Sequence, residues 1–337
     1  MTTIRVAIIG FGGIARFHYT AYRRLMDEGF PIEVVAVCDK NTAGLFDEVK
    51  INLGGDNVPL DKSTHIYTDM EELIAHEDFQ LADVCLPTFL HAEASVKLLR
   101  AGKHVICEKP MALSGKECEE MVRAAKESGK QLMIGQCLRF DPHYLYLKKC
   151  IEEKTYGSLR YLTLERLCDY PLWASDFKNS QRTGGCILDT HIHDVDIARF
   201  LLGEPLEVST IRYDNLPYCQ VVNSRLFYED LSVLIDVVWD DARPVPFAAG
   251  FHAKFDDACV ISDGETVTVK PHGKERYTVE VEAADRIVEE IRAIALAIQS
   301  GKTSEVNPPE SAMMSVKLVE MMKISAERRG ENIKINF

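Results

Sequence analysis

The chain opens with an apolar run that leads directly into a glycine-rich turn. Residues 4–9 read Ile-Arg-Val-Ala-Ile-Ile, and the following six residues have the spacing G-x-G-x-x-A. The run predicts a buried strand, and the helical pattern after the turn predicts a first helix over Ile14–Asp27. In this spacing the first glycine allows the turn, the second admits a pyrophosphate, and the small third residue permits close helix–strand packing. An ordinary strand–helix turn is the alternative, but the strand before and the helix after favour dinucleotide binding. The residues expected at this site are Gly10, Phe11, Gly12, Gly13 and Ile14.

Strand-like and helical patterns alternate up to about residue 138. The expected strands are Arg5–Ile9, Ile32–Cys38, Leu81–Leu86, His104–Glu108 and Gln131–Ile134. The further expected helices are Met70–His76, Leu90–Arg100 and Ser114–Ser128, with Ser114 as an N-cap and Gly102 and Gly129 as stops. Apolar strands that alternate with helices predict a doubly wound parallel sheet, so residues 1–138 read as an α/β Rossmann domain.

The pattern changes after Arg139. Asp141-Pro142 predicts the start of a helix that runs to Glu153. The expected strands beyond it are Leu159–Leu167, Glu207–Tyr213, Val221–Tyr228, Ser232–Trp239, Ala248–Phe255, Thr266–Val269 and Tyr277–Val281. The expected helices are Thr190–Leu202, Asp285–Gln299 and Glu310–Arg328. Residues 139–337 therefore read as an α+β domain with a mostly antiparallel sheet and helices on one face.

Alternation along one of these strands predicts which of its faces is buried. In Ser232–Trp239, the residues Val233, Ile235, Val237 and Trp239 share one face. The opposite face is half apolar, which is compatible with an oligomer interface without requiring one.

Composition narrows the classes of function. The chain has 337 residues and a formal net charge of -13, which argues against nucleic acid and anionic membranes as partners. No apolar stretch has the length of a membrane span, and no signal-peptide pattern precedes the first strand. None of the 10 cysteines forms a C-x-x-C pair. Such cysteines are typical of small buried side chains in a reducing compartment, and we expect a cytoplasmic protein.

Asp39 follows the second predicted strand. A carboxylate at this position accepts hydrogen bonds from the adenosine ribose and repels a 2′-phosphate, which favours NAD over NADP. The neighbouring Lys40 keeps NADP open, and a turn or N-cap role for Asp39 is the structural alternative.

Two more loops follow predicted strands of the same sheet. Pro87, Thr88 and His91 come after the third of them, and Glu108-Lys109-Pro110 ends the fourth. Because ligands of open α/β sheets lie outside the carboxyl ends of the strands, these residues are candidates for cofactor contact. Lys109 could also donate to a substrate oxygen and lower the pKa of a bound alcohol. The alternatives are a helix first-turn role for His91 and a surface loop role for Lys109.

Asp189 and His193 are spaced four residues apart in a predicted helix, which places them on one face. A carboxylate and an imidazole there can orient a substrate and move a proton near neutral pH. Asp189 could instead cap the helix, Asp196 reads as structural, and His191 points elsewhere. No third partner completes a metal site, so we expect no metal.

Together these motifs resemble the Gfo/Idh/MocA oxidoreductase family, which is named for glucose–fructose oxidoreductase and inositol dehydrogenase. The resemblance rests on the glycine turn, Pro87-Thr88 with His91, Glu108-Lys109-Pro110, and the helix that carries Asp189 and His193. It implies that Lys109 is the family's lysine, His193 its catalytic histidine and Asp189 its helix aspartate. It also implies a homodimer or homotetramer formed through a large C-terminal sheet. His191 departs from the pattern, because the family often has glycine there.

These features predict an NAD-dependent oxidoreductase that acts on a secondary alcohol or ketone of a sugar, cyclitol or related polyol. A dinucleotide-binding sensor, or an enzyme that uses NAD transiently for glycoside cleavage, are the alternatives. Arg139, Tyr170 and Trp173 are candidate substrate residues. Arg139 could equally form an ion pair.

Overall fold

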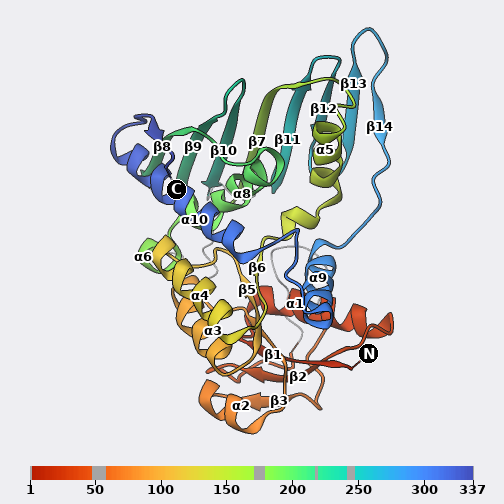
Figure 1. The fold of residues 1–337 in the computed structure, drawn as a ribbon, viewed down its shortest axis with the longest axis vertical. Helices are drawn as coiled ribbons and strands as arrows, with labels where there is room; N and C mark the ends of the chain where they lie inside the picture. Colours follow the sequence, from red (N-terminus) through yellow and green to blue (C-terminus); the bar gives the residue numbers. More distant parts are fainter. Residues whose placement is uncertain (1, 48–57, 171–178, 217–218, 241–246, 337) are drawn as a thin grey trace. The chain divides into compact units, whose positions relative to one another are not determined.

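The computed structural model describes residues 2–47, 58–170, 179–216, 219–240 and 247–336, and these divide into two compact units (Figure 1). The first unit comprises Met1–Cys137 and Asp285–Met313. The second comprises Leu138–Ala284 and Met314–Phe337. No helix in the described residues is long and apolar enough to cross a membrane.

The first unit is built on a fully parallel sheet with the strand order β3-β2-β1-β4-β5-β6. Its strands are β1 (Ile4–Ile9), β2 (Ile32–Cys38), β3 (His65–Tyr67), β4 (Leu81–Val84), β5 (His104–Glu108) and β6 (Leu132–Gly135). The order reverses where β1 pairs with β4, because β2 lies on one side of β1 and β4 on the other. This is the doubly wound arrangement predicted from the sequence, and its ligands bind at the carboxyl ends of the strands beside the reversal.

Helices cover this sheet. They are α1 (Gly13–Asp27), α2 (Met70–His76), the 3-10 helix η1 (Thr88–Leu90), α3 (His91–Arg100) and α4 (Gly115–Ser128). The predicted caps of α4 are confirmed: the Ser114 side chain accepts from the backbone of Glu117, and Gly129 ends the helix in the left-handed conformation. Both choices follow from local chemistry, since serine satisfies a free N–H group and glycine adopts positive φ without strain.

A helix from near the C-terminus also belongs to the first unit. In α9 (Arg286–Ser300), residues Val288, Ile291 and Ile294 are buried in the same hydrophobic cluster as Tyr22 and Leu25 of α1. Asp285–Met313 therefore returns to the first unit, whereas the sequence analysis assigned all of 139–337 to the second. The spacing of apolar residues shows that a helix has a buried face, but it does not show which core buries that face.

The second unit contains a sheet with the order β14-β13-β12-β11-β7-β10-β9-β8-β15. Its strands are β7 (Leu159–Asp169), β8 (Glu207–Leu216), β9 (Cys219–Phe227), β10 (Ser232–Asp240), β11 (Ala248–Phe255), β12 (Ala258–Ser262), β13 (Val267–Pro271), β14 (Tyr277–Val279) and β15 (Ile333–Lys334). All described pairings are antiparallel except the one between β7 and β10. The predicted face of β10 is confirmed, because Val233, Ile235, Val237 and Trp239 are all buried.

The remaining elements are η2 (Cys137–Phe140), α5 (Pro142–Glu152), α6 (Ser180–Thr183), α7 (Cys186–Asp189), α8 (His191–Leu202) and α10 (Pro309–Glu327). Two buried aspartates of α8 are paired with arginines of the second unit. Asp194 receives hydrogen bonds from Arg166 of β7 at 2.8 and 3.0 Å. Asp196 receives two from Arg139, both at 2.7 Å. These bidentate pairs fix the rotation and the position of α8 against its neighbours.

Short strands and one helix break were not predicted. The strands β3, β12 and β15 are absent from the sequence analysis, and they pair at or near sheet edges. The expected helix over Thr190–Leu202 proves to be α8, preceded by the separate short helix α7. The side chain of Thr190, between them, accepts a 2.6 Å hydrogen bond from Nε1 of Trp239.

We expect the Arg166–Asp194 pair to be needed for the stability of the second unit. Arg166→Met should lower its free energy of unfolding by about 3–5 kcal/mol, because Asp194 would remain buried without its cation. Denaturant unfolding followed by tryptophan fluorescence reports this unit, since Trp239 is buried in it. The double variant Arg166→Met/Asp194→Leu should recover most of the loss. A double variant no more stable than the single one would contradict this account of the pair.

Candidate functional site

The glycine turn lies where the order of the parallel sheet reverses. Gly10 follows β1 with φ +83, and a Cβ atom there would lie 2.9 Å from the carbonyl oxygen of Cys85, which follows β4. Gly12 is the N-cap of α1, and a Cβ atom added to it would meet nothing within 4 Å. The first glycine is therefore required by a close approach within the protein. The second leaves open space at the helix N-terminus.

The first turn of α1 is suited to an anion. No side chain caps this N-terminus, and its first turn contains no acidic residue. Ala15 is fully buried, as the close packing of helix and strand requires. Free backbone N–H groups together with the helix dipole bind phosphate groups. The turn thus fits the pyrophosphate of a dinucleotide.

Asp39 contacts the glycine turn directly. Its Oδ2 accepts a 2.6 Å hydrogen bond from the backbone N–H of Phe11, and its Oδ1 accepts one of 2.8 Å from Asn41. The carboxylate is half-buried at the carboxyl end of β2. A carboxylate so placed can accept from ribose hydroxyls, and it opposes a phosphate at the same place.

His91 connects the two loops that follow β4 and β5. It is buried, and its ring nitrogens lie 2.9 Å from the carbonyl oxygen of Pro110 and 2.7 Å from that of Leu86. Burial lowers the pKa of His91, although the two carbonyl groups act in the opposite direction. Both ring nitrogens are therefore occupied by backbone. The structure gives His91 a role in joining these loops, which the sequence analysis did not consider.

Lys109 stands directly after β5. The side chain is half-buried, and its peptide bond with Pro110 is cis. The backbone N–H of Lys109 donates to Oε2 of Glu108 at 3.1 Å. Of the other predicted residues of this edge, Thr88 is buried in η1 and Pro87 is exposed. The structure thus places the glycine turn, Asp39 and Lys109 at the carboxyl ends of β1, β2 and β5 of one parallel sheet, in which β4 separates β1 from β5.

In the second unit, Asp189 and His193 are the only residues of 186–199 that are not buried. Asp189 ends α7, and His193 lies in the first turn of α8. The Oδ2 atom of Asp189 accepts a 3.3 Å hydrogen bond from the hydroxyl group of Thr190. The exposed polar surface of this segment is therefore limited to one carboxylate and one imidazole.

Other residues singled out by sequence have different surroundings. His191 is fully buried, and within the described part of the chain neither ring nitrogen has a hydrogen-bond partner; burial lowers its pKa to about 3. Arg139 is only 2% exposed and paired with Asp196, so the geometry favours the ion-pair alternative over a substrate contact. The ring of Tyr170 packs edge-on to Trp239 at 5.7 Å. Trp173 lies outside the described residues.

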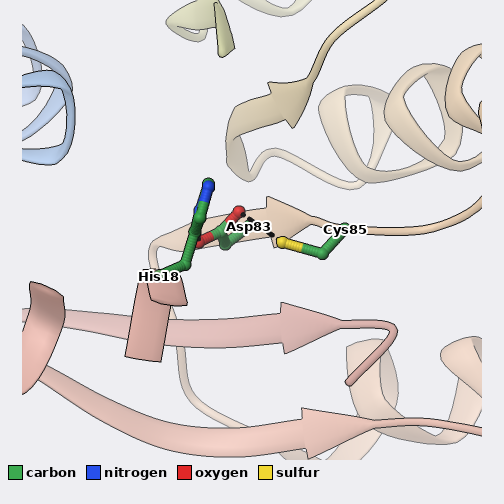
Figure 2. A group of neighbouring side chains, drawn as sticks. All are labelled: His18, Asp83 and Cys85. Atoms are coloured by element: carbon green, nitrogen blue, oxygen red, sulfur yellow. Dashed lines mark hydrogen bonds and ion pairs between the residues drawn. The ribbon is translucent and has the colours of Figure 1, made fainter. Parts of the chain in front are cut away.

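Sequence reasoning missed a buried polar cluster in the first unit. His18 of α1 lies between Asp83 of β4 and Glu108 of β5, with nitrogen–oxygen distances of 2.9 and 3.0 Å. Figure 2 shows His18 beside Asp83, with Cys85 on the same strand segment. Glu290 of α9 lies close to two of these residues. A ring nitrogen of His18, a carboxylate oxygen of Glu108 and a carboxylate oxygen of Glu290 all lie within 4.8 Å of one another. The one sequence signal for this cluster is His18 itself, a polar residue on the buried, apolar face of α1.

Two family models match the chain. A model described as an oxidoreductase family with an NAD-binding Rossmann fold matches residues 4–136. A model of the GFO/IDH/MocA C-terminal domain matches residues 144–238. The two matches fall in the first and second structural units, respectively.

Curated relatives include dehydrogenases and a hydratase. Inositol 2-dehydrogenase of Rhizobium meliloti is 30% identical over 208 residues, which are 61% of this chain and 58% of that protein. The 2,7-anhydro-N-acetylneuraminate hydratase of Mediterraneibacter gnavus is 29% identical over 219 residues, 65% of this chain and 54% of that protein. The chain thus matches little more than half the length of these relatives.

Solved structures with the same fold cover the whole chain. Levoglucosan dehydrogenase in complex with NADH and L-sorbose aligns with a TM-score of 0.82 at 19% identity, covering 100% of both chains. At this identity the likeness establishes the fold alone. Since the two family models account for both units, the chain belongs to the GFO/IDH/MocA family of NAD-binding oxidoreductases.

Proposed function

We propose that this protein transfers a hydride between NAD and a secondary alcohol or ketone of a sugar, cyclitol or related polyol. The observation that carries the proposal is the selective exposure of Asp189 and His193 in an otherwise buried segment. A pure dinucleotide-binding module needs neither a carboxylate nor an imidazole there. The names of the relatives, which include inositol and levoglucosan dehydrogenases, support a polyol as the second reactant.

The glycine turn and Asp39 would hold the cofactor, whose nicotinamide supplies the hydride acceptor. The first turn of α1 binds its phosphates, and Asp39 accepts from the adenosine ribose. Pro87, Thr88, Glu108 and Lys109 remain candidates for contact with the rest of the cofactor. His91 acts on them indirectly, because it joins the loops that carry them.

The remaining roles belong to the substrate. His193 accepts the proton of the substrate hydroxyl group at its imidazole. The Lys109 ammonium group donates to a substrate oxygen and stabilises negative charge on it. Asp189 binds a substrate hydroxyl or orients His193. Holding both reactants in place removes much of the entropic barrier.

A second function stays open because one relative is named a hydratase. The corresponding alternative from the sequence analysis is an enzyme that uses NAD transiently, for glycoside cleavage, and releases a product without net oxidation. Absorbance of NADH during incubation with NAD and a panel of sugars, polyols and anhydrosugars separates the two. Steady accumulation of NADH supports the dehydrogenase, and product without NADH supports internal redox cycling.

We also propose that the protein works in a reducing compartment, as the cytoplasm is, and as a homo-oligomer. The structure describes all ten cysteines, and none of them forms a disulfide. The sheet of the second unit exposes apolar side chains on its strands, including Ile211 and Tyr213 of β8, which are 44% and 51% exposed. Such side chains favour a second copy as partner. Light scattering of the purified protein tests the oligomeric state.

Lys109→Met should lower kcat by about 10²–10⁴-fold, the usual contribution of a positioned proton donor or acceptor. The dissociation constant for NAD should change little, because the phosphate and ribose contacts remain. Lys116→Met is the matched control, since Lys116 is exposed on α4. Steady-state kinetics and a fluorescence titration with NADH measure the two quantities. Turnover at the wild-type rate in the Lys109 variant would rule out its proposed role.

Asp39→Ser should shift cofactor preference towards NADP. The ratio of kcat/KM for NADP to that for NAD should rise about tenfold or more, which corresponds to about 1.4 kcal/mol. The affinity for NAD should also fall, because Asp39 holds the N–H group of Phe11 in the glycine turn. An unchanged ratio would show that Asp39 does not select the cofactor.

A further inference from the structure

The buried cluster of the first unit forms one chain of hydrogen bonds that ends at Lys109. Asp83 Oδ2 lies 2.9 Å from Nδ1 of His18, and Nε2 of His18 lies 3.0 Å from Oε1 of Glu108. Oε2 of Glu108 then accepts from the backbone N–H of Lys109 at 3.1 Å. A Cβ atom at Gly135 would lie 2.9 Å from Oε1 of Glu108. The Glu108 carboxylate therefore occupies space that only glycine in β6 leaves free.

Glu290 faces this chain without joining it. The residue is fully buried, and neither of its carboxylate oxygens has a hydrogen-bond partner among the residues that the structure describes. One of these oxygens lies within 4.8 Å of a ring nitrogen of His18 and of a carboxylate oxygen of Glu108. An ionised carboxylate in this place would be desolvated, unpaired and close to a second carboxylate, an arrangement that strongly disfavours charge.

Charge balance narrows the possible states. Three carboxyl groups, from Asp83, Glu108 and Glu290, surround one imidazole, and only that imidazole lies in hydrogen-bond reach of two of them. If His18 is an imidazolium, both of its nitrogens donate, one to Asp83 and one to Glu108. The third carboxyl group is then left with no cation of its own. A proton on Glu290 removes the charge of this third carboxyl group, which has no counter-ion bonded to it among the described residues, and leaves Asp83 and Glu108 to share the one imidazolium.

We propose that Glu290 is a positioning residue that is held as a neutral carboxylic acid, and that its neutrality keeps Glu108 bonded to His18 and to the backbone of Lys109. If Glu290 ionised, its charge would repel Glu108 and compete for His18. The link between Glu108 and Lys109 would then weaken. The catalytic role of Lys109 rests on the proposed function, whereas the protonation state of Glu290 is independent of that function.

The electrostatics of the cluster agree with this assignment. Burial, and next the charge of Glu108, raise the pKa of Glu290 well above its ordinary value. Burial acts to lower the pKa of His18, but Asp83 and Cys85 together outweigh it and raise that pKa well above the ordinary value. The titratable and charged groups that act on the cluster come from every neighbouring element: His18 and Tyr22 of α1, Asp83 and Cys85 at β4, Glu108 of β5, Cys137 of η2 and Arg286 of α9.

The sign of the pH dependence follows from the raised pKa of Glu290. Above about pH 4.5 the unfolded chain loses this proton while the folded protein keeps it, so stability falls as pH rises. Between the two pKa values the contribution changes the unfolding equilibrium constant tenfold per pH unit. Glu290→Gln keeps the shape and neutrality of the acid and removes this titration.

The first experiment compares the wild-type protein with Glu290→Gln and with the control Glu289→Gln. Glu289 is the adjacent residue of α9, partly exposed and paired with Arg292. Infrared spectra of the wild-type protein at neutral pH should contain a protonated carboxyl band that Glu290→Gln alone lacks. The melting temperature of Glu290→Gln minus that of the wild type should rise steadily above about pH 4.5. Absence of the band, or a difference that is independent of pH, would overturn the proposal.

The second experiment tests positioning without any substrate. Amide hydrogen exchange of the peptide that contains Lys109, measured by mass spectrometry, should become several-fold faster in the wild type than in Glu290→Gln as pH rises. A merely structural role would change exchange evenly across β4, β5 and α9, and that result would contradict the positioning role.

Metal analysis of the purified protein provides a further check. A stoichiometric divalent ion that is lost in Glu290→Gln would replace the proton with a cation and refute the proposal.

Discussion

The close approach of Gly10 to the carbonyl group of Cys85 is the constraint on which the first unit depends. A side chain at position 10 would place a Cβ atom 2.9 Å from that oxygen. The contact joins the turn after β1 to the segment after β4, where the strand order reverses. Because the turn is fixed there, α1 begins with an uncapped N-terminus and open space beside Gly12. The dinucleotide site therefore follows from a packing requirement between two strands.

The second unit relies on charge to place its polar residues. Asp194 and Asp196 of α8 are bonded to Arg166 and Arg139, and both pairs are buried. Each broken pair would leave a charge without a partner in a medium of low polarity, which resists any rotation of the helix. His193 belongs to the same helix and is one of the residues that remain accessible. The aspartates that hold the helix are thus distinct from the aspartate proposed to meet the substrate.

Local patterns allowed most elements to be predicted. The range Ile32–Cys38, the helix Met70–His76 and the capping of α4 depend on neighbouring residues, and all were found as expected. The assignment of α9 to the first unit, the break at Thr190 and the linking role of His91 depend on residues distant in the sequence. For the same reason the partners of His18 could not be inferred, since Asp83, Glu108 and Glu290 come from separate elements. The spacing of apolar residues identifies the buried face of a helix or strand, but the fold determines which other elements pack against that face.

The central claim is that this chain moves a hydride between a CH–OH carbon and NAD. The most direct measurement incubates the protein and NAD with a panel of polyols labelled with deuterium at the CH–OH carbon, and follows both the product and the cofactor by mass spectrometry. The account predicts one deuterium atom on the nicotinamide ring for each molecule of ketone formed. Product that forms while the cofactor pool stays oxidised and unlabelled would contradict net hydride transfer.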